Sequence, residues 1–333
     1  MIYKFGMVAS LSGYIAKNVI LGKKRFPFVL MLEPTLRCNL ACAGCGRIRE
    51  YKDCMDKLLS VEECISSARE AKAPVVSITG GEPLLHPNIL EIVGGLLEEK
   101  FFVYLCTNGL LLGDFLTKLR PHPRFSFVLH VDGLARTHDA IARKKGVFEN
   151  AINVIRKAKQ LGFEVRTNTT IYRNSNIDEI NKLFSILRSC GVDGMMVSPA
   201  FSYQEVKDEL FLTKREVNQI FTEIYKSRNG ARFYNTPIYR DFLIGARELK
   251  CTPWGNPTRN IKGWKSPCYL ITDEHYGTYE DMMRLTRWGN YGSGNDPRCA
   301  NCMVHSGYEA SAIFETGKSL RDLWRMMRWN LFS

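Results

Sequence analysis

The stretch 35-TLRCNLACAGCGRI-48 carries three cysteines, Cys38, Cys42 and Cys45, separated by three and then two residues. Soft thiolate sulfurs bind iron and zinc, so three of them on one short loop are typical of a metal ligand set. Structural zinc and a four-iron cluster both ordinarily take four protein ligands. Cys54, nine residues further on, is badly placed to be the fourth. The loop therefore predicts an iron–sulfur cluster with one iron left open.

The composition is that of an ordinary globular chain, with 333 residues, 45% of them hydrophobic and 24% charged. Without a long apolar run or a secretory signal pattern, we expect a cytoplasmic protein with reduced thiols. Most of the eleven cysteines are then expected to be ligands or reactive thiols, and Cys54, Cys64 and Cys190 to be packing residues. The net charge of +12 is spread along the chain, and we expect no nucleic-acid partner.

From residue 27 onward, short apolar runs alternate with amphipathic stretches, which predicts β/α units and a parallel sheet. The expected strands are Phe28–Glu33, Val75–Thr79, Phe102–Thr107, Phe125–Val131, Glu164–Thr170 and Met195–Pro199. The expected helices lie near 60–72, 88–100, 110–119, 147–161, 177–189 and 213–228. Periodicity alone leaves open a partial barrel or a flat doubly wound sheet. The rhythm breaks near residue 230, so we expect an N-terminal helix at 1–26, a core domain at 27–230 and a different architecture at 231–333.

A second motif, 79-TGGEP-83, follows the second expected strand. Together with the cysteine triad it resembles the radical S-adenosylmethionine superfamily over roughly residues 27–230. The resemblance implies an α/β fold, a partial (β/α)6 TIM-like barrel. It also implies a [4Fe-4S] cluster whose open iron is chelated by S-adenosyl-L-methionine, so that a fourth cysteine would block the reaction. One electron to this cluster would then release a 5′-deoxyadenosyl radical.

The glycines Gly80 and Gly81 allow a close backbone approach and positive φ, which suits docking of a methionyl amino group. Glu82 is expected to accept that ammonium, and Pro83 to fix the exit of the turn. On later strands, the resemblance assigns contacts with S-adenosylmethionine to three further residues: His130, Asp132 and Asn168. A buried, hydrogen-bonded core role for His130 remains an alternative.

The C-terminal region holds four more cysteines: Cys251, Cys268, Cys299 and Cys302. Their grouping resembles a twitch domain, a short extension that carries one auxiliary iron–sulfur cluster. Structural zinc is the alternative, because four thiolates form a closed tetrahedral set. His305 is either a substitute ligand or a residue of the surrounding shell or core.

Longer strings, including 28-FVLMLEPTLRCNLACAGCGR-47 and 298-RCANCMVHSGYEA-310, resemble the adenosylhopane synthase family of hopanoid biosynthesis. The resemblance implies that the adenosyl radical adds to the terminal alkene of diploptene, a triterpene hydrocarbon. Cys106, near the end of the third expected strand, is then a candidate donor of a hydrogen atom to the product radical; its alternative is a small core residue. The rival functions are a twitch-type enzyme that modifies a peptide or nucleotide-linked substrate and an electron-transfer protein.

Apolar residues recur near helical spacing before residue 21, with Lys17 and the basic run 23–25 nearby. This pattern predicts a helix that either lies on the core or meets a membrane surface. A substrate that resides in a bilayer favours the second reading and a location at the inner face of the membrane. An external electron donor such as flavodoxin or ferredoxin would reduce the cluster.

Overall fold

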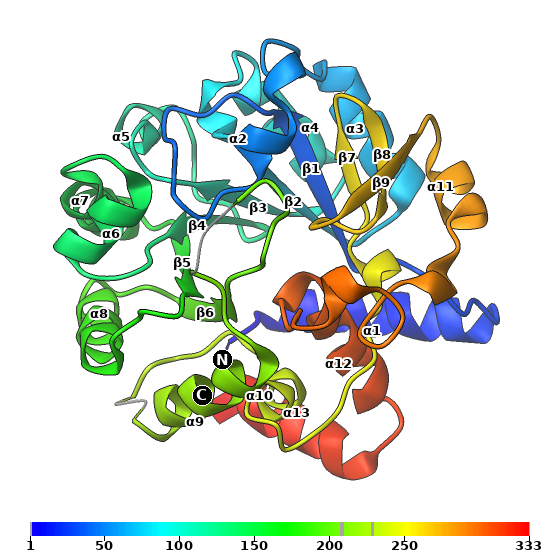
Figure 1. The fold of residues 1–333 in the computed structure, drawn as a ribbon. Helices are drawn as coiled ribbons and strands as arrows, with labels where there is room; N and C mark the ends of the chain where they lie inside the picture. The colour runs from blue at the N-terminus through cyan, green and yellow to red at the C-terminus, as the bar shows by residue number, and fades with distance from the viewer. Residues whose placement is uncertain (1, 207–209, 228–229, 333) are drawn as a thin grey trace.

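The computed structural model describes residues 2–206, 210–227 and 230–332, through which one nine-stranded sheet runs (Figure 1). The strand order is β6-β5-β4-β3-β2-β1-β7-β8-β9. The strands are β1 Val29–Thr35, β2 Val75–Gly80, β3 Phe102–Thr107, β4 Phe125–His130, β5 Glu164–Ile171, β6 Gly194–Pro199, β7 Thr258–Asn260, β8 Gly263–Pro267 and β9 Thr272–Tyr276. Each of the six strands expected from the sequence is present, within two residues at either end.

Strands β1 to β6 are all parallel and pair in chain order. Strand β6 ends the order on one side, while β1 pairs on its other edge with β7. The six strands therefore form an open, partial barrel of the α/β class, which confirms the predicted fold. Strands β7 to β9 belong to the C-terminal region and extend the same sheet, with β8 and β9 antiparallel to their neighbours.

The larger helices that follow or precede these strands are α1 Phe5–Ile20, α3 Val61–Ala71, α4 Ile89–Glu98, α6 Ala135–Ala142, α7 Val147–Gln160, α8 Ile177–Ser189, α9 Lys214–Lys226, α12 His305–Thr316 and α13 Leu320–Phe332. The shorter ones are α2 Arg47–Glu50, α5 Leu112–Phe115, α10 Pro237–Leu243 and α11 Tyr279–Leu285. The helix expected over 110–119 is thus only four residues long, since it contains Gly113 and has no capping side chain. Position 228 of another expected helix lies outside the described residues, as do 1, 207–209, 229 and 333.

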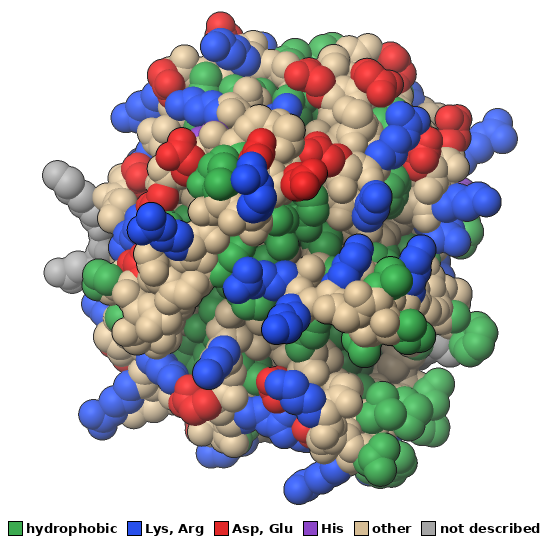
Figure 2. Space-filling model, turned by 90° about the vertical axis from the view of Figure 1, so that its right-hand side faces the viewer, with side chains coloured by type: hydrophobic (Ala, Val, Ile, Leu, Met, Phe, Trp, Pro, Cys, Tyr) green, Lys and Arg blue, Asp and Glu red, His purple; other side chains and the backbone are tan. Residues whose placement is uncertain are grey.

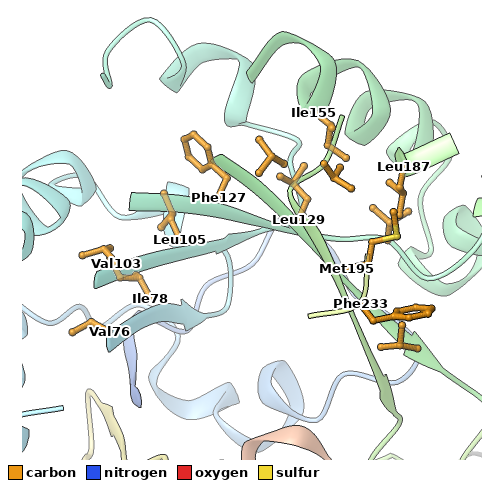
Figure 3. Close-up of a cluster of buried hydrophobic side chains, with 14 of the residues drawn as sticks. Val76, Ile78, Val103, Leu105, Phe127, Leu129, Ile155, Leu187, Met195 and Phe233 are labelled. Atoms are coloured by element: carbon orange, nitrogen blue, oxygen red, sulfur yellow. The ribbon is translucent and has the colours of Figure 1, made fainter. Parts of the chain in front are cut away.

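Alternation along each strand separates a hydrophobic core from a central cavity. Side chains such as Val76, Leu105 and Leu129 belong to one buried hydrophobic cluster that also contains Ile155 and Leu187 of the surrounding helices (Figure 3). The intervening side chains point to the other side, where they line the cavity: Ser77, Tyr104, Cys106, Val128, His130, Arg166, Asn168, Met196 and Ser198. The cysteines expected to be packing residues, Cys54, Cys64 and Cys190, are buried.

Helix α1 crosses the N-terminal ends of the barrel strands. Its Met7 packs with Val75 and Phe102, and Lys4 pairs with Glu164 at 2.7 Å. The first half of the helix therefore forms a floor beneath the barrel, as the packing alternative predicted, whereas Val19 and Ile20 at its other end are exposed. Within the described ranges, no helix combines the length and the apolar character that crossing a bilayer requires.

Candidate active site

A cavity of about 470 Å³ occupies the interior of the barrel. Its upper end is formed by the cysteine loop and the C-terminal ends of the strands, and its lower end by Tyr3, Met7 and Leu11 at α1. Helix α12 contributes to its wall through His305 and Glu309. Most of its lining is apolar.

The three cysteines of the loop, Cys38, Cys42 and Cys45, all line this cavity. Glycines let the loop pack closely, because a Cβ on Gly44 would lie 2.8 Å from the ring of Tyr172. Burial raises the pKa of the Cys38 thiol to about 11 and that of Cys42 to about 12. These thiols keep their protons until a metal displaces them.

The donor set fits an iron–sulfur cluster better than a single metal ion. Among the described residues, no three His, Cys, Asp or Glu side chains converge closely enough to hold one ion. A mononuclear zinc needs four sulfurs within about 2.3 Å of one centre, so its ligands must be close together. A four-iron cluster is itself larger and takes each thiolate at a different iron. Cys38, Cys42 and Cys45 would hold such a cluster at the top of the cavity.

The glycines of the Thr-Gly-Gly-Glu-Pro motif lie against the cysteine loop. Gly80 has a φ of +108°, and a Cβ there would lie 2.4 Å from the carbonyl oxygen of Thr35. A Cβ on Gly81 would lie 2.0 Å from the carbonyl oxygen of Arg37, whose oxygen also accepts the backbone N–H of Glu82 at 2.7 Å. The sequence suggested that these two glycines let a ligand come close to the backbone. In the structure they let the backbone of the cysteine loop come close.

Glu82 lines the cavity, but its carboxylate already accepts three hydrogen bonds from the chain. The donors are the Leu84 N–H at 3.1 Å, the Thr107 hydroxyl at 2.8 Å and the Asn108 N–H at 2.9 Å. Burial raises its pKa. Pro83 opens a short 3₁₀ turn, Pro83–Leu85, as the expected exit of the motif. Glu82 thus couples the β2 and β3 ends beneath the loop.

Residues at the ends of β4 and β5 form a polar group on the cavity wall. His130 Nε2 lies 2.8 Å from Asp132, whose other oxygen accepts the Thr170 N–H at 2.7 Å. Burial alone would raise the pKa of Asp132, but His130 beside it lowers it. The His130 side chain is 42% exposed, toward the cavity, so it is not a buried core residue.

The buried polar atoms at this wall without a hydrogen-bond partner among the described residues include Asn168 Oδ1 and His138 Nε2. Both residues line the cavity. An unpaired buried polar atom is costly, so each is a place where a bound molecule would supply the missing partner. Sequence reasoning found Asn168 but missed His138, which lies on α6, a helix that the sequence did not predict.

Cys106, the second-last residue of β3, faces the cavity and not the hydrophobic core. Its sulfur lies 3.4 Å from the Ser77 hydroxyl on β2. Burial raises its pKa to about 11. At neutral pH this residue is therefore a thiol with its hydrogen in place.

A buried ionic network connects the cysteine loop to the C-terminal region. The guanidinium of Arg47 pairs with Glu33 at 2.8 Å and with Glu50 at 2.9 Å. It also lies 4.3 Å from the ring centre of Tyr269 and donates to the carbonyl oxygen of that residue. Lys265 pairs with Glu50 from the other side, and burial lowers its pKa to about 8. No sequence period joins residues so far apart, so this network was missed.

The C-terminal cysteines are Cys251, Cys268, Cys299 and Cys302, and the last three share a small apolar cluster with Phe201 and Val304. Burial raises the pKa of the Cys251 thiol, and the other three cysteines raise it further. His305 contacts Ser198, 3.0 Å from Nδ1, at the cavity wall. Burial lowers its pKa to about 4, so it is neutral.

The lower end of the cavity holds a cation among tyrosine rings, which sequence reasoning also missed. Arg166 lies 3.9 Å from the ring centre of Tyr234 and within 5.3 Å of those of Tyr3 and Tyr104. It pairs with Glu164, while its Nη1 has no hydrogen-bond partner among the described residues. This end of the cavity therefore offers one hydrogen-bond donor in aromatic surroundings.

Solved structures with the same fold include native anSMEcpe with bound AdoMet, with a TM-score of 0.58 and 15% identity over 92% of this chain and 100% of that one. SuiB from Streptococcus suis bound to the precursor peptide SuiA has a TM-score of 0.56 and 18% identity, covering 68% and 52% of the two chains. At these identities the likeness establishes the fold alone.

Curated relatives are closer in sequence. An AdoMet-dependent heme synthase from Methanosarcina barkeri is 30% identical over 169 residues, 50% of this chain and 48% of the relative. Molybdenum cofactor biosynthesis protein 1 from Drosophila melanogaster is 31% identical over 274 residues, 78% and 45% of the two chains. The chain thus spans about half the length of the curated relatives it matches.

Two family models match the chain. A domain of unknown function, DUF3463, matches residues 195–326, and the Radical SAM superfamily matches residues 32–187. The second match contains the cysteine triad, the Gly-Gly-Glu-Pro turn and the polar wall of the cavity. Members of that superfamily use a [4Fe-4S] cluster and S-adenosylmethionine. Over residues 32–187 the chain is therefore similar to the radical SAM superfamily.

Proposed function

We propose that this protein is a radical SAM transferase, an adenosylhopane synthase that joins the 5′-deoxyadenosyl group to the terminal alkene carbon of diploptene. The observation that carries the proposal is Cys106, a protonated thiol that opens into a largely apolar cavity inside the barrel. The long sequence strings that resemble the adenosylhopane synthase family support the same reaction.

The proposed cofactor site is the upper end of the cavity. When bound through Cys38, Cys42 and Cys45, the reduced cluster together with S-adenosylmethionine supplies the 5′-deoxyadenosyl radical. Asn168 Oδ1 is unpaired and buried, and accepts a hydrogen bond from the cosubstrate in our proposal. Asp132 and His130 form the neighbouring wall. The turn opposite this wall positions the edge of the cysteine loop and consists of Gly80, Gly81, Glu82 and Pro83. Glu82 contributes by holding backbone N–H groups, not by contacting the cosubstrate.

The apolar middle of the cavity is the proposed place of the hydrocarbon. Removing apolar surface from water contributes about 25 cal/mol per Å², and a molecule without polar groups has no other source of affinity. Side chains from neighbouring strands, Val128 and Met196 among them, supply such surface beside Cys106. Register pairs Cys106 with Val128, and Val128 with Arg166, so the three positions share one level of the sheet.

Cys106 has a defined role in this scheme. Addition at the terminal carbon leaves an unpaired electron on the adjacent tertiary carbon, and the Cys106 S–H bond breaks to give that carbon its hydrogen atom. A proton and an electron from the external donor, such as flavodoxin or ferredoxin, then restore the thiol. A strand-bound thiol delivers the atom to one face only.

The C-terminal cysteines are proposed to hold a second [4Fe-4S] cluster, with zinc as the alternative. Cys268, Cys299 and Cys302 share one apolar cluster, which supports a common site. Since no three His, Cys, Asp or Glu side chains of the described residues converge on a single ion, a cluster fits this site better than zinc. We further propose that residues 27–230 form the catalytic barrel and 231–333 a twitch-like domain, with 1–26 as a helix that closes the floor. A location in the cytoplasm at the inner face of the membrane follows from a bilayer substrate.

One observation favours a second candidate, a twitch-type enzyme that acts on a peptide or nucleotide-linked substrate. The unpaired Nη1 of Arg166 at the cavity floor is a donor that a pure hydrocarbon cannot satisfy. A substrate with a hydrogen-bond acceptor at its far end would satisfy it. Relatives named as GTP 3',8-cyclase and the peptide-bound structure of SuiB illustrate that the superfamily handles such molecules.

Anaerobic turnover with diploptene, S-adenosylmethionine and a reductant tests the two candidates by product mass. Addition yields a product with the mass of the substrate plus the 5′-deoxyadenosyl group and one hydrogen atom, whereas hydrogen abstraction leaves free 5′-deoxyadenosine. If diploptene gives no adduct under conditions that cleave S-adenosylmethionine, the adenosylhopane proposal is wrong.

The thiol role is tested by Cys106→Ala, with Cys64→Ala as the matched control because Cys64 is buried in the hydrophobic core. The Cys106 variant is expected to form the adduct with mixed configuration at the quenched carbon, and the control to form one isomer. In deuterated water the native enzyme should place one deuterium at that carbon. The same single isomer at the native rate from Cys106→Ala would assign the hydrogen to another donor.

A further inference from the structure

The C-terminal helix α13 buries Asp322 and Trp329 on its inward side and exposes a row of apolar side chains on the other. Asp322 lies inside, paired with Arg247 at 2.8 Å, and Trp329 donates its indole N–H to the carbonyl oxygen of Phe233. The opposite side carries five exposed apolar residues at spacings of three, one, three and four, which we name the α13 stripe: Leu320, Leu323, Trp324, Met327 and Leu331. Such spacing places all five on one face of the helix.

The α13 stripe continues onto the beginning of α1. The N–H groups of Ile2 and Tyr3 both donate to Asn330, so the two helices meet at their ends. Phe5 at that end of α1 and Phe332 at the end of α13 are 77% and 81% exposed. Apolar side chains exposed in such a row are costly in water unless something covers them.

The charges beside the stripe are positive. Arg321 and Arg328 lie on one flank of it, about 80–100° around the helix from Leu320 at 100° per residue. The guanidinium of Arg328 lies 5.4 Å from the ring centre of Trp324. In the described part of α13, the one acidic residue is Asp322, which is turned inward. Figure 2 shows one face of the molecule, with hydrophobic side chains gathered at its lower right and with lysines and arginines interspersed with acidic side chains over the rest.

We propose that the α13 stripe, together with Phe5, docks the protein on an anionic lipid bilayer. A helix with apolar residues on one face and cations at its flank lies in the interface, where lipid tails cover the former and anionic headgroups pair with the latter. A second copy of the chain is a poorer occupant, because self-association through this face would bring Arg321 and Arg328 toward the same residues of the other copy.

Helix α13 lies between the docking surface and the floor of the cavity. Tyr3 lines that floor, and its ring meets the ring of Trp329 on the inward side of α13, with 5.7 Å between centres. A hydrocarbon leaving the bilayer at this face would therefore be separated from the barrel interior by this helix. This consequence rests on the proposed function, whereas the docking itself does not, because it follows from the exposed residues alone.

The test is sedimentation of the cluster-loaded full chain with vesicles of phosphatidylcholine containing phosphatidylglycerol, without substrate. The stripe variant Leu323→Ser/Trp324→Ser/Met327→Ser should bind the vesicles at least about tenfold more weakly, since it loses three apolar side chains that would insert into the bilayer. A matched control, Leu161→Ser/Leu285→Ser, removes two side chains of similar exposure elsewhere and should bind like the native protein. Arg321→Gln/Arg328→Gln should weaken binding mainly at low salt.

Each outcome decides the proposal. Weaker vesicle binding by the stripe variant, with iron content and S-adenosylmethionine cleavage retained, supports it even if diploptene proves not to be the substrate. Absent binding of the native protein, or native-like binding by the stripe variant, overturns it. A native dimer that the stripe variant converts to a monomer, with no vesicle binding, assigns the stripe to self-association and also overturns it.

Discussion

Replacement of Glu309 by Gln should change how stability depends on pH. Glu309 lies on α12 at the cavity wall, where it accepts the Thr236 N–H at 3.0 Å and the Thr236 hydroxyl at 2.7 Å. Burial raises the pKa of its carboxyl group to about 7, because the ionised form would be poorly solvated there. In the unfolded chain a glutamate titrates near its ordinary value of about 4.3.

The sign follows from proton binding. Between these two pKa values the folded protein binds one proton more than the unfolded chain, so the native free energy of unfolding falls as pH rises through this window. The stabilisation is fully present below the unfolded pKa and is lost as pH passes the folded value of about 7. The difference between the folded and unfolded pKa corresponds to a change in the free energy of unfolding on the order of 3 kcal/mol in a dry cavity, and to a smaller change if water enters. A glutamine cannot ionise and shows no such loss.

Denaturant unfolding of the native protein and Glu309→Gln at pH 5 and pH 8 measures the effect. The variant is expected to gain stability relative to the native protein between the two pH values. Glu315→Gln on the same helix is the control, since Glu315 pairs at the surface with Lys318 at 2.7 Å. An unchanged difference between native protein and Glu309→Gln across this range would refute the reasoning and imply a normally ionised carboxylate.

Three further predictions concern the two proposed metal sites and the Gly-Gly-Glu-Pro turn. Replacing any one of Cys38, Cys42 and Cys45 by alanine should abolish release of 5′-deoxyadenosine. A variant that still cleaves S-adenosylmethionine would contradict the assignment of these residues as cluster ligands. Reconstituted protein should carry about eight iron atoms per chain if the C-terminal cysteines hold a second cluster, whereas four irons plus one zinc would favour structural metal and four irons alone would leave those thiols free. Gly81→Ala should cost about 1–3 kcal/mol in unfolding free energy and lower iron loading, because its Cβ would meet the Arg37 carbonyl oxygen at 2.0 Å; Gly94→Ala, with nothing within 4 Å, is the control, and equal effects would refute the argument.

The N-terminal segment helps to form the cavity. Tyr3 and Met7 line the cavity floor, so deletion of the segment would open the barrel. Substitutions on the α13 stripe separate membrane contact from cavity integrity, because those side chains face away from the protein.

The sequence by itself determined the parts that depend on local pattern. Alternating strands and amphipathic helices defined the six parallel β/α units, since periodicity directly reflects which face is buried. The spacing of Cys38, Cys42 and Cys45 defined the candidate cluster loop, because neighbouring residues of one loop must remain close in any fold. Strand position likewise placed Cys106 and Asn168 toward one end of the sheet.

Only the tertiary structure decided what distant segments form together. Residues from separate elements meet where Arg47 contacts Tyr269 and where tyrosine rings surround Arg166. The unpaired nitrogen of His138 faces the same cavity from another helix. No local periodicity in the sequence encodes such arrangements. The outward apolar face of α13 was equally hidden, since an amphipathic pattern shows that a helix has an apolar side but not where that side points. That direction is set by packing, here by the inward ion pair of Asp322 with Arg247.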